Sequence, residues 1–266
     1  MYWYGGELID ATQLTLSVDE PGLLFGATVF TTLRSRGGQP VVWEAHRDRL
    51  NDSVRDLGWQ LPDWERVESG LQEIAKLYPV VRVTLFPDGR EWILGRSLPA
   101  DLAIWQRDGA RVIVLPNVAR SLPAHKTGNY LACWQVRAQA RQQHAQEAIF
   151  TDASGAWLET STGNLWGLHR GTWLTPPLAA GILPGIARSR LWETLIATGN
   201  IPATPFWDAE LVAQLDAIAY SNCIVGVVPL REVRWPTGEK RVLSVDCQAL
   251  RHLQQQLPEC LADADL

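Results

Sequence analysis

A lysine and a later glutamate are the residues of this sequence best suited to chemistry. Lys126 lies in the segment HKTGNYL, between an irregular run that contains Pro123 and a pattern that predicts a helix over residues 130–143. A lysine that loses part of its hydration in such a place gives up its proton readily and condenses with an aldehyde. On an open surface the same residue would be an ordinary solvated charge.

The glutamate is Glu159, in the segment LETSTGNLW. It lies on a predicted strand that follows a turn at residues 153–155, and Trp157 and Ser161 point to the same side of that strand. A buried carboxylate that faces a pyridine nitrogen keeps the nitrogen protonated, and this makes pyridoxal 5'-phosphate (PLP) an electron sink. The lysine and the glutamate together therefore predict PLP as the cofactor.

Four segments carry a resemblance to a known family. FTTLR, HKTGNYL, LETSTGNLW and GILPGIAR occur in the family order, and the resemblance runs from about residue 6 to about residue 229. Together they resemble the fold-type IV PLP enzymes, which include branched-chain aminotransferases, D-amino-acid aminotransferases and 4-amino-4-deoxychorismate lyases. The resemblance implies a two-domain fold of mixed α/β or α+β class, with the active site between the domains, a small-molecule substrate and a homodimer.

The resemblance also implies which residues hold the cofactor. Lys126 and Glu159 match the family's lysine and glutamate, and Tyr130 matches a tyrosine that reaches the phenolic oxygen. The expected phosphate ligands are Arg49 of the HxxRL pattern, the helix entry at Gly185, Ile186 and Ala187, and the group Ser221, Asn222 and Cys223. Each has a plainer alternative: an exposed helix arginine, a buried tyrosine bonded to backbone, a helix entry without ligand, and a β-bulge.

The substrate side is predicted from the strand that begins near residue 27. If this segment is extended, Phe30, Thr32 and Arg34 share one face, where a hydroxyl and a guanidinium suit a substrate carboxylate. A half-exposed strand with its polar side in water is the alternative. After the strand VRVTL, where many relatives have an arginine-glycine pair, this chain has FPDGR, so Arg90, Arg96 or Arg34 is expected to take over the carboxylate.

Composition excludes several classes of function. With 46% hydrophobic and 20% charged residues the chain is that of a globular protein, and a net charge of −5 without a basic block argues against nucleic-acid binding. The four cysteines show no metal-ligand spacing, so no metal is expected. The N-terminal residues lack a signal-peptide pattern and no apolar run reaches 18 residues, so we expect a cytoplasmic protein without a membrane partner.

An irregular segment that contains Pro123 predicts where the chain divides into domains. An N-terminal α+β domain is expected over 1–116, an interdomain linker over 117–124 and a C-terminal PLP-binding domain over 125–266. Helices are predicted over 64–77 and 244–257, and paired strands around the turn at 87–90. The polar pair Ser221 and Asn222 is expected to interrupt a single strand.

Within the family, FTTLR and SNCIVGVVPL are closer to the lyases, whereas KTGNYL is equally compatible with the branched-chain aminotransferases. The resemblance thus favours a 4-amino-4-deoxychorismate lyase of folate biosynthesis, which forms 4-aminobenzoate and pyruvate with Lys126 and Thr32 as catalytic residues. A branched-chain or D-amino-acid aminotransferase is the second hypothesis. A relative that binds the cofactor without catalysis is the third.

Overall fold

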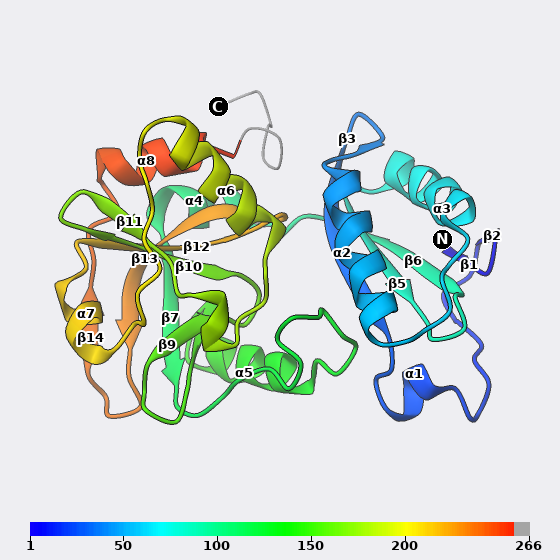
Figure 1. The fold of residues 1–266 in the computed structure, drawn as a ribbon, viewed down its shortest axis with the longest axis horizontal. Helices are drawn as coiled ribbons and strands as arrows, with labels where there is room; N and C mark the ends of the chain where they lie inside the picture. The colour runs from blue at the N-terminus through cyan, green and yellow to red at the C-terminus, as the bar shows by residue number, and fades with distance from the viewer. Residues whose placement is uncertain (258–266) are drawn as a thin grey trace. The chain divides into compact units, whose positions relative to one another are not determined.

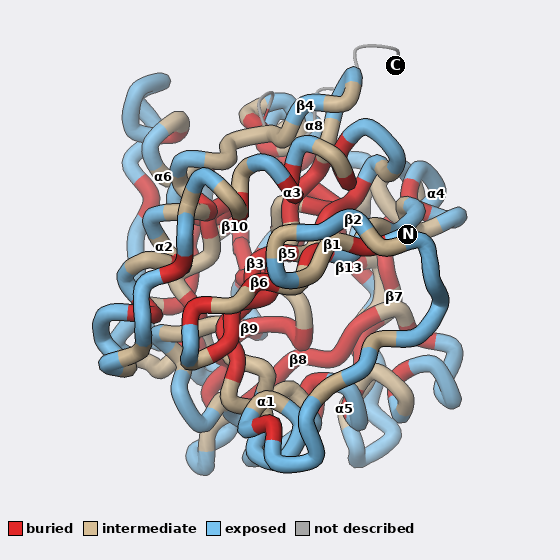
Figure 2. Tube along the Cα trace, turned by 90° about the vertical axis from the view of Figure 1, so that its right-hand side faces the viewer, coloured by how far each residue is buried: buried red, intermediate tan, exposed pale blue. Residues whose placement is uncertain are grey.

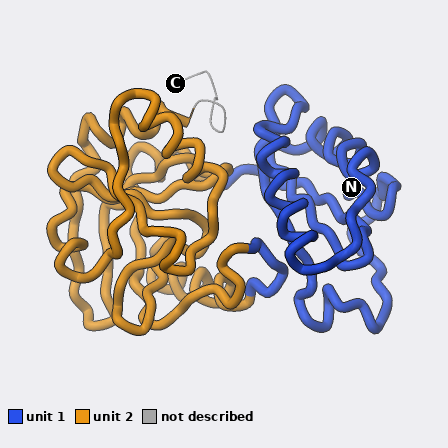
Figure 3. Tube along the Cα trace, viewed as in Figure 1, with its two compact units in different colours: residues 1–99, 125–130 blue, residues 100–124, 131–266 orange. Residues whose placement is uncertain are grey.

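The computed structural model describes residues 1–257, which form two compact units (Figures 1 and 3). Unit 1 comprises residues 1–99 and 125–130, and unit 2 comprises residues 100–124 and the chain from 131 onward. This division differs from the predicted boundaries. The strand at 110–115 belongs to the sheet of unit 2, and residues 125–130 pair with a strand of unit 1.

Unit 1 is built on one six-stranded antiparallel sheet in the order β2-β1-β6-β5-β3-β4. Its strands are β1 (Tyr2–Tyr4), β2 (Glu7–Ile9), β3 (Val29–Arg36), β4 (Gln39–Pro40), β5 (Val80–Leu85) and β6 (Glu91–Arg96). Its helices are α1 (Pro21–Leu24), α2 (Trp43–Asp56) and α3 (Trp64–Leu77). The predictions of the 64–77 helix and of the strand pair around residues 87–90 are confirmed.

The two faces of this sheet have different residues. Val29 and Leu33 of β3 join Val81 and Val83 of β5 in a core with the buried sides of α2 and α3. Because strand side chains alternate, the opposite face carries Phe30, Thr32 and Arg34 of β3 together with Arg82 and Thr84 of β5. The predicted division of β3 into two faces is thereby confirmed.

Unit 2 is built on a mixed eight-stranded sheet in the order β11-β10-β12-β13-β7-β8-β9, with β14 beside β13. Its strands are β7 (Ala110–Leu115), β8 (Glu147–Thr151), β9 (Trp157–Thr160), β10 (Asn164–His169), β11 (Thr172–Leu174), β12 (Ala217–Asn222), β13 (Gly226–Arg234) and β14 (Lys240–Val242). Its helices are α4 (Leu102–Asp108), α5 (Leu131–Gln142), the 3₁₀ turn η1 (Leu178–Ala180), α6 (Ile186–Ala197), α7 (Ala209–Gln214) and α8 (Gln248–Gln255).

Strand β7 lies between β13 and β8 and is parallel to both, while the other pairings of this sheet are antiparallel. Every residue of β8 and β9 is buried (Figure 2). One prediction is wrong in this unit. The pair Ser221 and Asn222 does not interrupt a strand but ends β12, and β13 begins after a short turn at Gly226.

Candidate active site

The segment that contains Lys126 is fixed by backbone pairing to the start of β3. The amide of Phe30 donates to the carbonyl of Lys126 at 2.8 Å, and the amide of Gly128 donates to the carbonyl of Thr28 at 2.7 Å. A β-bridge joins Val29 and Thr127. The catalytic candidate is thus held beside a regular strand rather than on a free loop, which makes the position of its amine well defined.

The glycine of HKTGNYL is explained by the same pairing. A Cβ on Gly128 would lie 2.2 Å from the Thr28 hydroxyl and 2.8 Å from the carbonyl of Gly26. Only a residue without a side chain allows this close backbone approach. The glycine therefore serves to bring Lys126 against β3.

Aromatic rings surround the lysine side chain. Lys126 Nζ lies 4.8 Å from the ring centroid of Phe30 and 5.2 Å from that of Tyr130, and the two rings meet edge to face at 5.4 Å. The sequence contains three lysines. Lys76 is exposed and bonds Glu73, Lys240 is exposed on β14, and Lys126 alone of the three is partly buried. Lys126 is therefore the amine best placed for condensation with an aldehyde.

Arg82 is a candidate site residue that the sequence interpretation did not include. It lies directly opposite Thr32 in the β3–β5 register, with its Cζ 3.6 Å from the Phe30 ring centroid and its Nε 3.2 Å from the Thr84 hydroxyl. Burial lowers the pKa of Arg82 to about 10, so the guanidinium keeps its charge at neutral pH. Among residues 1–257 no carboxylate pairs with it. The alternation of VVRVTL, which puts Arg82 on the face opposite Val81 and Val83, was the available signal.

Arg49, the predicted phosphate ligand, is oriented by a buried hydroxyl. Its Nη2 donates to Thr31 Oγ1 at 2.8 Å, and Thr31 Oγ1 also bonds His46 Nδ1 at 2.5 Å. Thr31 is fully buried and His46 is 1% exposed. The face of β3 that carries Thr31 therefore sets the direction of the Arg49 side chain, whereas Thr32 and Arg34 lie on the other face.

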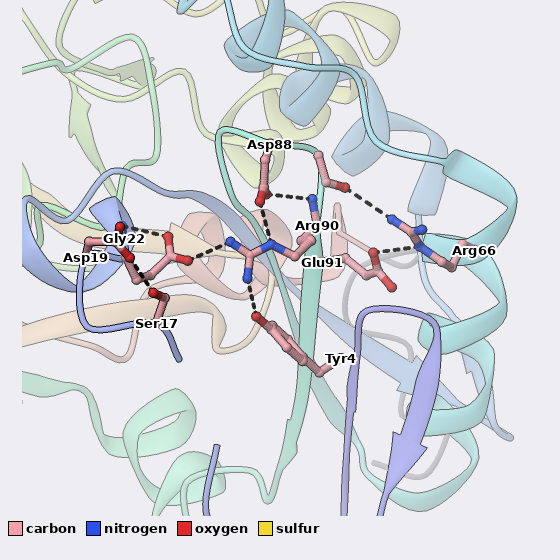
Figure 4. Close-up of polar contacts among 10 residues, drawn as sticks. Tyr4, Ser17, Asp19, Gly22, Arg66, Asp88, Arg90 and Glu91 are labelled. Carbon is pink, nitrogen blue, oxygen red and sulfur yellow. Dashed lines mark hydrogen bonds and ion pairs between the residues drawn. The ribbon is translucent and has the colours of Figure 1, made fainter. Parts of the chain in front are cut away.

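Arg90, a predicted substrate ligand, belongs to a different network (Figure 4). Its guanidinium donates to Glu20 at 2.6 Å, to Asp88 at 2.5 Å and to the hydroxyl of Tyr4 at 2.5 Å. The Glu20 side chain is 1% exposed, so the Arg90–Glu20 pair ties the turn after β5 to the start of α1. These contacts engage Arg90 with two carboxylates, whereas no carboxylate pairs with Arg82 among residues 1–257.

In unit 2, Glu159 forms a buried ion pair. Its Oε1 lies 2.6 Å from Arg120 Nε, and the side chains of Arg120 and Glu159 are 8% and 3% exposed. The amide of Leu183 lies 3.4 Å from the same oxygen. Arg120 also reaches the carbonyl of Ser161 at 3.5 Å. Pairing allows a carboxylate to stay ionised in a buried place. The sequence interpretation had treated the segment of Arg120 as a linker and missed this contact.

The entry of α6 has the features of an anion site. Gly185 is its N-cap, no side chain within the described residues caps the helix, and the first helical bond runs from Ser189 N to Gly185 O. The residues of the first turn, Ile186 and Ala187, are buried, so amides without a helical partner lie away from water. A Cβ on Gly185 would lie 2.0 Å from Asn164 Oδ1. The close packing there requires glycine.

A positive charge lies on the same turn. Arg188 is 7% exposed, donates to the Thr175 hydroxyl and the Pro176 carbonyl at 3.2 Å each, and its burial lowers its pKa. Within residues 1–257 no carboxylate pairs with Arg188, so its charge adds to the positive end of the helix dipole. The arrangement at residues 185–188 therefore fits a phosphate group.

The predicted group at the end of β12 is ordered by side-chain hydrogen bonds. Trp166 Nε1 donates to Ser221 Oγ at 3.0 Å, and Asn222 Oδ1 accepts from the amides of Ile224 and Val225 at 2.8 and 2.9 Å. Ser221 is 1% exposed. The part of the chain that the structure describes has no cluster of His, Cys, Asp and Glu able to hold a metal and no helix long and apolar enough to cross a membrane.

Two solved structures show that this fold is a known one. The 4-amino-4-deoxychorismate lyase from Pseudomonas aeruginosa matches with a TM-score of 0.84 and 24% identity, over 100% of both chains. The PLP-bound form of a hypothetical aminotransferase from Mycobacterium tuberculosis matches with a TM-score of 0.85 and 20% identity, over 99% of both chains. These matches show the fold.

The family follows from sequence. Residues 28–233 match the model of the amino-transferase class IV family, and the chain belongs to this family of PLP enzymes. An aminodeoxychorismate lyase from Vibrio harveyi is 22% identical over 90% of this chain and 93% of its own length. A bifunctional aminodeoxychorismate lyase / D-amino acid transaminase from Mycobacterium tuberculosis is 29% identical over 73% of this chain and 77% of its own length. The predicted family, fold class and cofactor are thereby confirmed.

Proposed function

We propose that this chain is a PLP-dependent lyase that converts 4-amino-4-deoxychorismate to 4-aminobenzoate and pyruvate. The observation that carries the proposal is the shared position of Lys126 and Arg82 on the ring of Phe30, at 4.8 and 3.6 Å from its centroid. An amine for condensation and a desolvated cation for a carboxylate thus meet on one face of unit 1. The proposed substrate carries an amine and two carboxylates, and suits this pair.

A hydroxyl on the same face favours the lyase over the aminotransferase. Thr32 is the cross-strand partner of Arg82, so its hydroxyl lies next to the cation on the face of β3 that carries Phe30. A lyase must deliver a proton to the group that leaves, whereas an aminotransferase returns the proton to the cofactor. Relatives described as lyase, and as both lyase and transaminase, are consistent with either chemistry.

Each of three side chains, together with the cofactor, has a separate chemical role in the proposed mechanism. PLP supplies an electron sink when it is bound. Lys126 would hold the cofactor through its amine, and the same amine, when free, would take the proton from the ring carbon that bears the substrate amine. Glu159 holds a proton on the pyridine nitrogen. Thr32 or Lys126 delivers a proton to the departing enolpyruvyl group, so that pyruvate leaves and the remaining ring becomes aromatic.

Other residues bind and orient. Arg82 and Arg34 hold the substrate carboxylates, and Tyr130 donates toward the phenolic oxygen of the cofactor. The phosphate is held by Arg49, by the amides of Ile186 and Ala187 and by the group that contains Ser221, Asn222 and Cys223. In the same proposal the enzyme is a cytoplasmic homodimer of folate biosynthesis, and gel filtration tests the dimer.

Product analysis tests the reaction. The holoenzyme is expected to release equal amounts of pyruvate and 4-aminobenzoate from aminodeoxychorismate, measured with coupled lactate dehydrogenase and by fluorescence. In parallel, the cofactor spectrum is recorded after addition of single L- and D-amino acids. Conversion to the pyridoxamine form by an amino acid, with no pyruvate from aminodeoxychorismate, would replace the lyase by the aminotransferase.

Replacement of Arg82 by methionine is expected to raise the KM for aminodeoxychorismate about 10- to 100-fold, because a charge-assisted hydrogen bond is worth about 1.5–3 kcal/mol. Arg36→Met is the matched control, since Arg36 is an exposed arginine at the end of β3. Steady-state kinetics with both variants measures the effect. A larger rise in KM for Arg90→Met than for Arg82→Met would return the carboxylate role to Arg90.

A further inference from the structure

A buried carboxylate in unit 2 has no role in the mechanism above. Glu147 begins β8 and is 3% exposed. Its Oε2 accepts the hydroxyl of Ser161, and its Oε1 accepts the hydroxyl of Thr162 at 2.5 Å. Within residues 1–257 no lysine, arginine or histidine forms an ion pair with it. The amide of Ala148 also lies 3.4 Å from Oε2. A buried carboxylate without a cation partner is costly, which suggests that it contributes something besides stability.

The charge of Glu147 affects its surroundings. Burial raises the pKa of Tyr220 well above its usual value, and the negative charge of Glu147 raises it further, while Arg137 opposes this. Tyr220 lies on β12, one residue before Ser221. The carboxylate thus lies close to the strand that ends at the predicted phosphate group.

The carboxylate fixes the direction of a chain of hydrogen bonds. A carboxylate only accepts, so the single proton of Thr162 Oγ1 points to Glu147 and the hydroxyl oxygen accepts from its other neighbour. That neighbour is Asn222, whose Nδ2 lies 3.3 Å from Thr162 Oγ1 and 3.3 Å from the Thr162 carbonyl. With its amide nitrogen toward Thr162, Asn222 turns its oxygen to the amides of Ile224 and Val225. The backbone groups around Asn222 require the same orientation of its amide, and the buried charge of Glu147 reinforces it through the Thr162 hydroxyl.

The end of β12, just before this turn, carries a hydroxyl donor without an acceptor in the described part of the chain. Ser221 Oγ accepts the Trp166 indole N–H, so the Ser221 proton is directed elsewhere, and no acceptor for it is found in the described part of the chain. Ser221 is 1% exposed. A buried hydroxyl donor at the end of β12 suits an anionic oxygen.

We propose that Glu147 is a positioning residue for the phosphate of PLP, and that it acts through Thr162 and Asn222 on the turn that presents Ser221 and Cys223. The inference rests on the placement of the phosphate in the proposed function, but not on the reaction that follows. Glutamine at position 147 would donate one hydrogen bond as well as accept one. A hydroxyl that receives this donation must send its proton elsewhere, which competes with the observed orientation of Asn222.

The test compares Thr162→Val with Thr162→Ser, and Glu147→Gln with Glu232→Gln. Valine removes the hydroxyl at nearly constant volume, serine restores it, and Glu232 is a strand glutamate of the same unit that pairs with Arg234. Dissociation constants for PLP are measured by titration of each apoenzyme. We also measure the rise in Tm of each apoenzyme on addition of inorganic phosphate, relative to the same variant without phosphate.

We expect Thr162→Val and Glu147→Gln to bind PLP about 3- to 10-fold more weakly, the scale of one hydrogen bond, and to lose most of the phosphate-induced rise in Tm. Thr162→Ser and Glu232→Gln should behave as the parent protein does. A purely structural role would lower the Tm of the apoenzyme but leave the phosphate-induced rise unchanged. That result, or a Thr162→Ser variant as weak as Thr162→Val, would overturn the proposal.

The outcome is separable from that of the proposed function. A parent enzyme that binds PLP but releases no pyruvate would refute the lyase while the PLP affinities still decide the role of Glu147. If Glu147→Gln does not fold, the pair of variants at Thr162 decides it.

Discussion

Lys126→Ala is expected to abolish covalent attachment of PLP and to lower turnover by about 10³- to 10⁶-fold, the range measured when a residue that forms a covalent intermediate is removed. The expectation rests on the distribution of amines in this protein. Lys76 and Lys240 are exposed, whereas Lys126 is partly buried against two aromatic rings and its backbone is paired to β3. Loss of this one side chain should therefore remove the only amine suited to the task.

Borohydride reduction followed by peptide mass mapping measures the attachment. In the parent protein the reduced cofactor is expected on a peptide that contains Lys126. Lys76→Ala and Lys240→Ala are the matched controls, and both should keep the label and the activity. A reduced cofactor on either of the other lysines, or a visible spectrum in Lys126→Ala equal to that of the parent, would reject the assignment.

Local periodicity accounts for the parts of the fold that the sequence predicted. The alternation of apolar and polar residues over β3 identified the face of Phe30, Thr32 and Arg34, because neighbouring strand residues point to opposite sides. The helix at 64–77 was predicted from its apolar spacing and has the same bounds in the structure. Such signals depend on a few consecutive residues and need no knowledge of the partner elements.

The parts that were missed depend on long-range pairing. Strand β7 follows the elements of unit 1 in sequence, but its parallel partners β13 and β8 come later in the chain, so no local pattern assigned it to unit 2. Arg120 likewise lies in an irregular segment. Its partner Glu159 is 39 residues further along the sequence, so no local pattern predicts their contact. The hydroxyl partners of Glu147 are likewise 14 and 15 residues away in sequence, so no local pattern marks this glutamate.

The ion-pair partners of two arginines differ in a way that the sequence could not show. Arg90 was a candidate for substrate because it follows the strand where relatives have an arginine. In the structure Glu20 and Asp88 engage it, whereas Arg82 has no such partner among the described residues. The charge of a side chain can be read from sequence, but the charge left for a ligand depends on the folded neighbours.

Glu159→Gln is expected to lower turnover at least about 100-fold, the scale on which removal of one fixed electrostatic group slows an active site. The amide has nearly the same shape but cannot hold a proton on the pyridine nitrogen of PLP. The change also leaves Arg120 as a buried cation without its carboxylate, which is expected to cost about 3–5 kcal/mol of stability.

A double-mutant cycle separates these two effects, because Arg120→Met removes the pairing but keeps the carboxylate. Denaturant unfolding of the apoenzymes should show that Arg120→Met combined with Glu159→Gln is less destabilised than the sum of the two single variants, since neither charge is then left alone. Turnover should follow a different order: Arg120→Met keeps more activity than Glu159→Gln, and the double variant stays as slow as Glu159→Gln. If Glu159→Gln retained the parent's turnover while losing stability, the glutamate would be a partner of Arg120 alone, and another group would have to hold the proton on the cofactor ring.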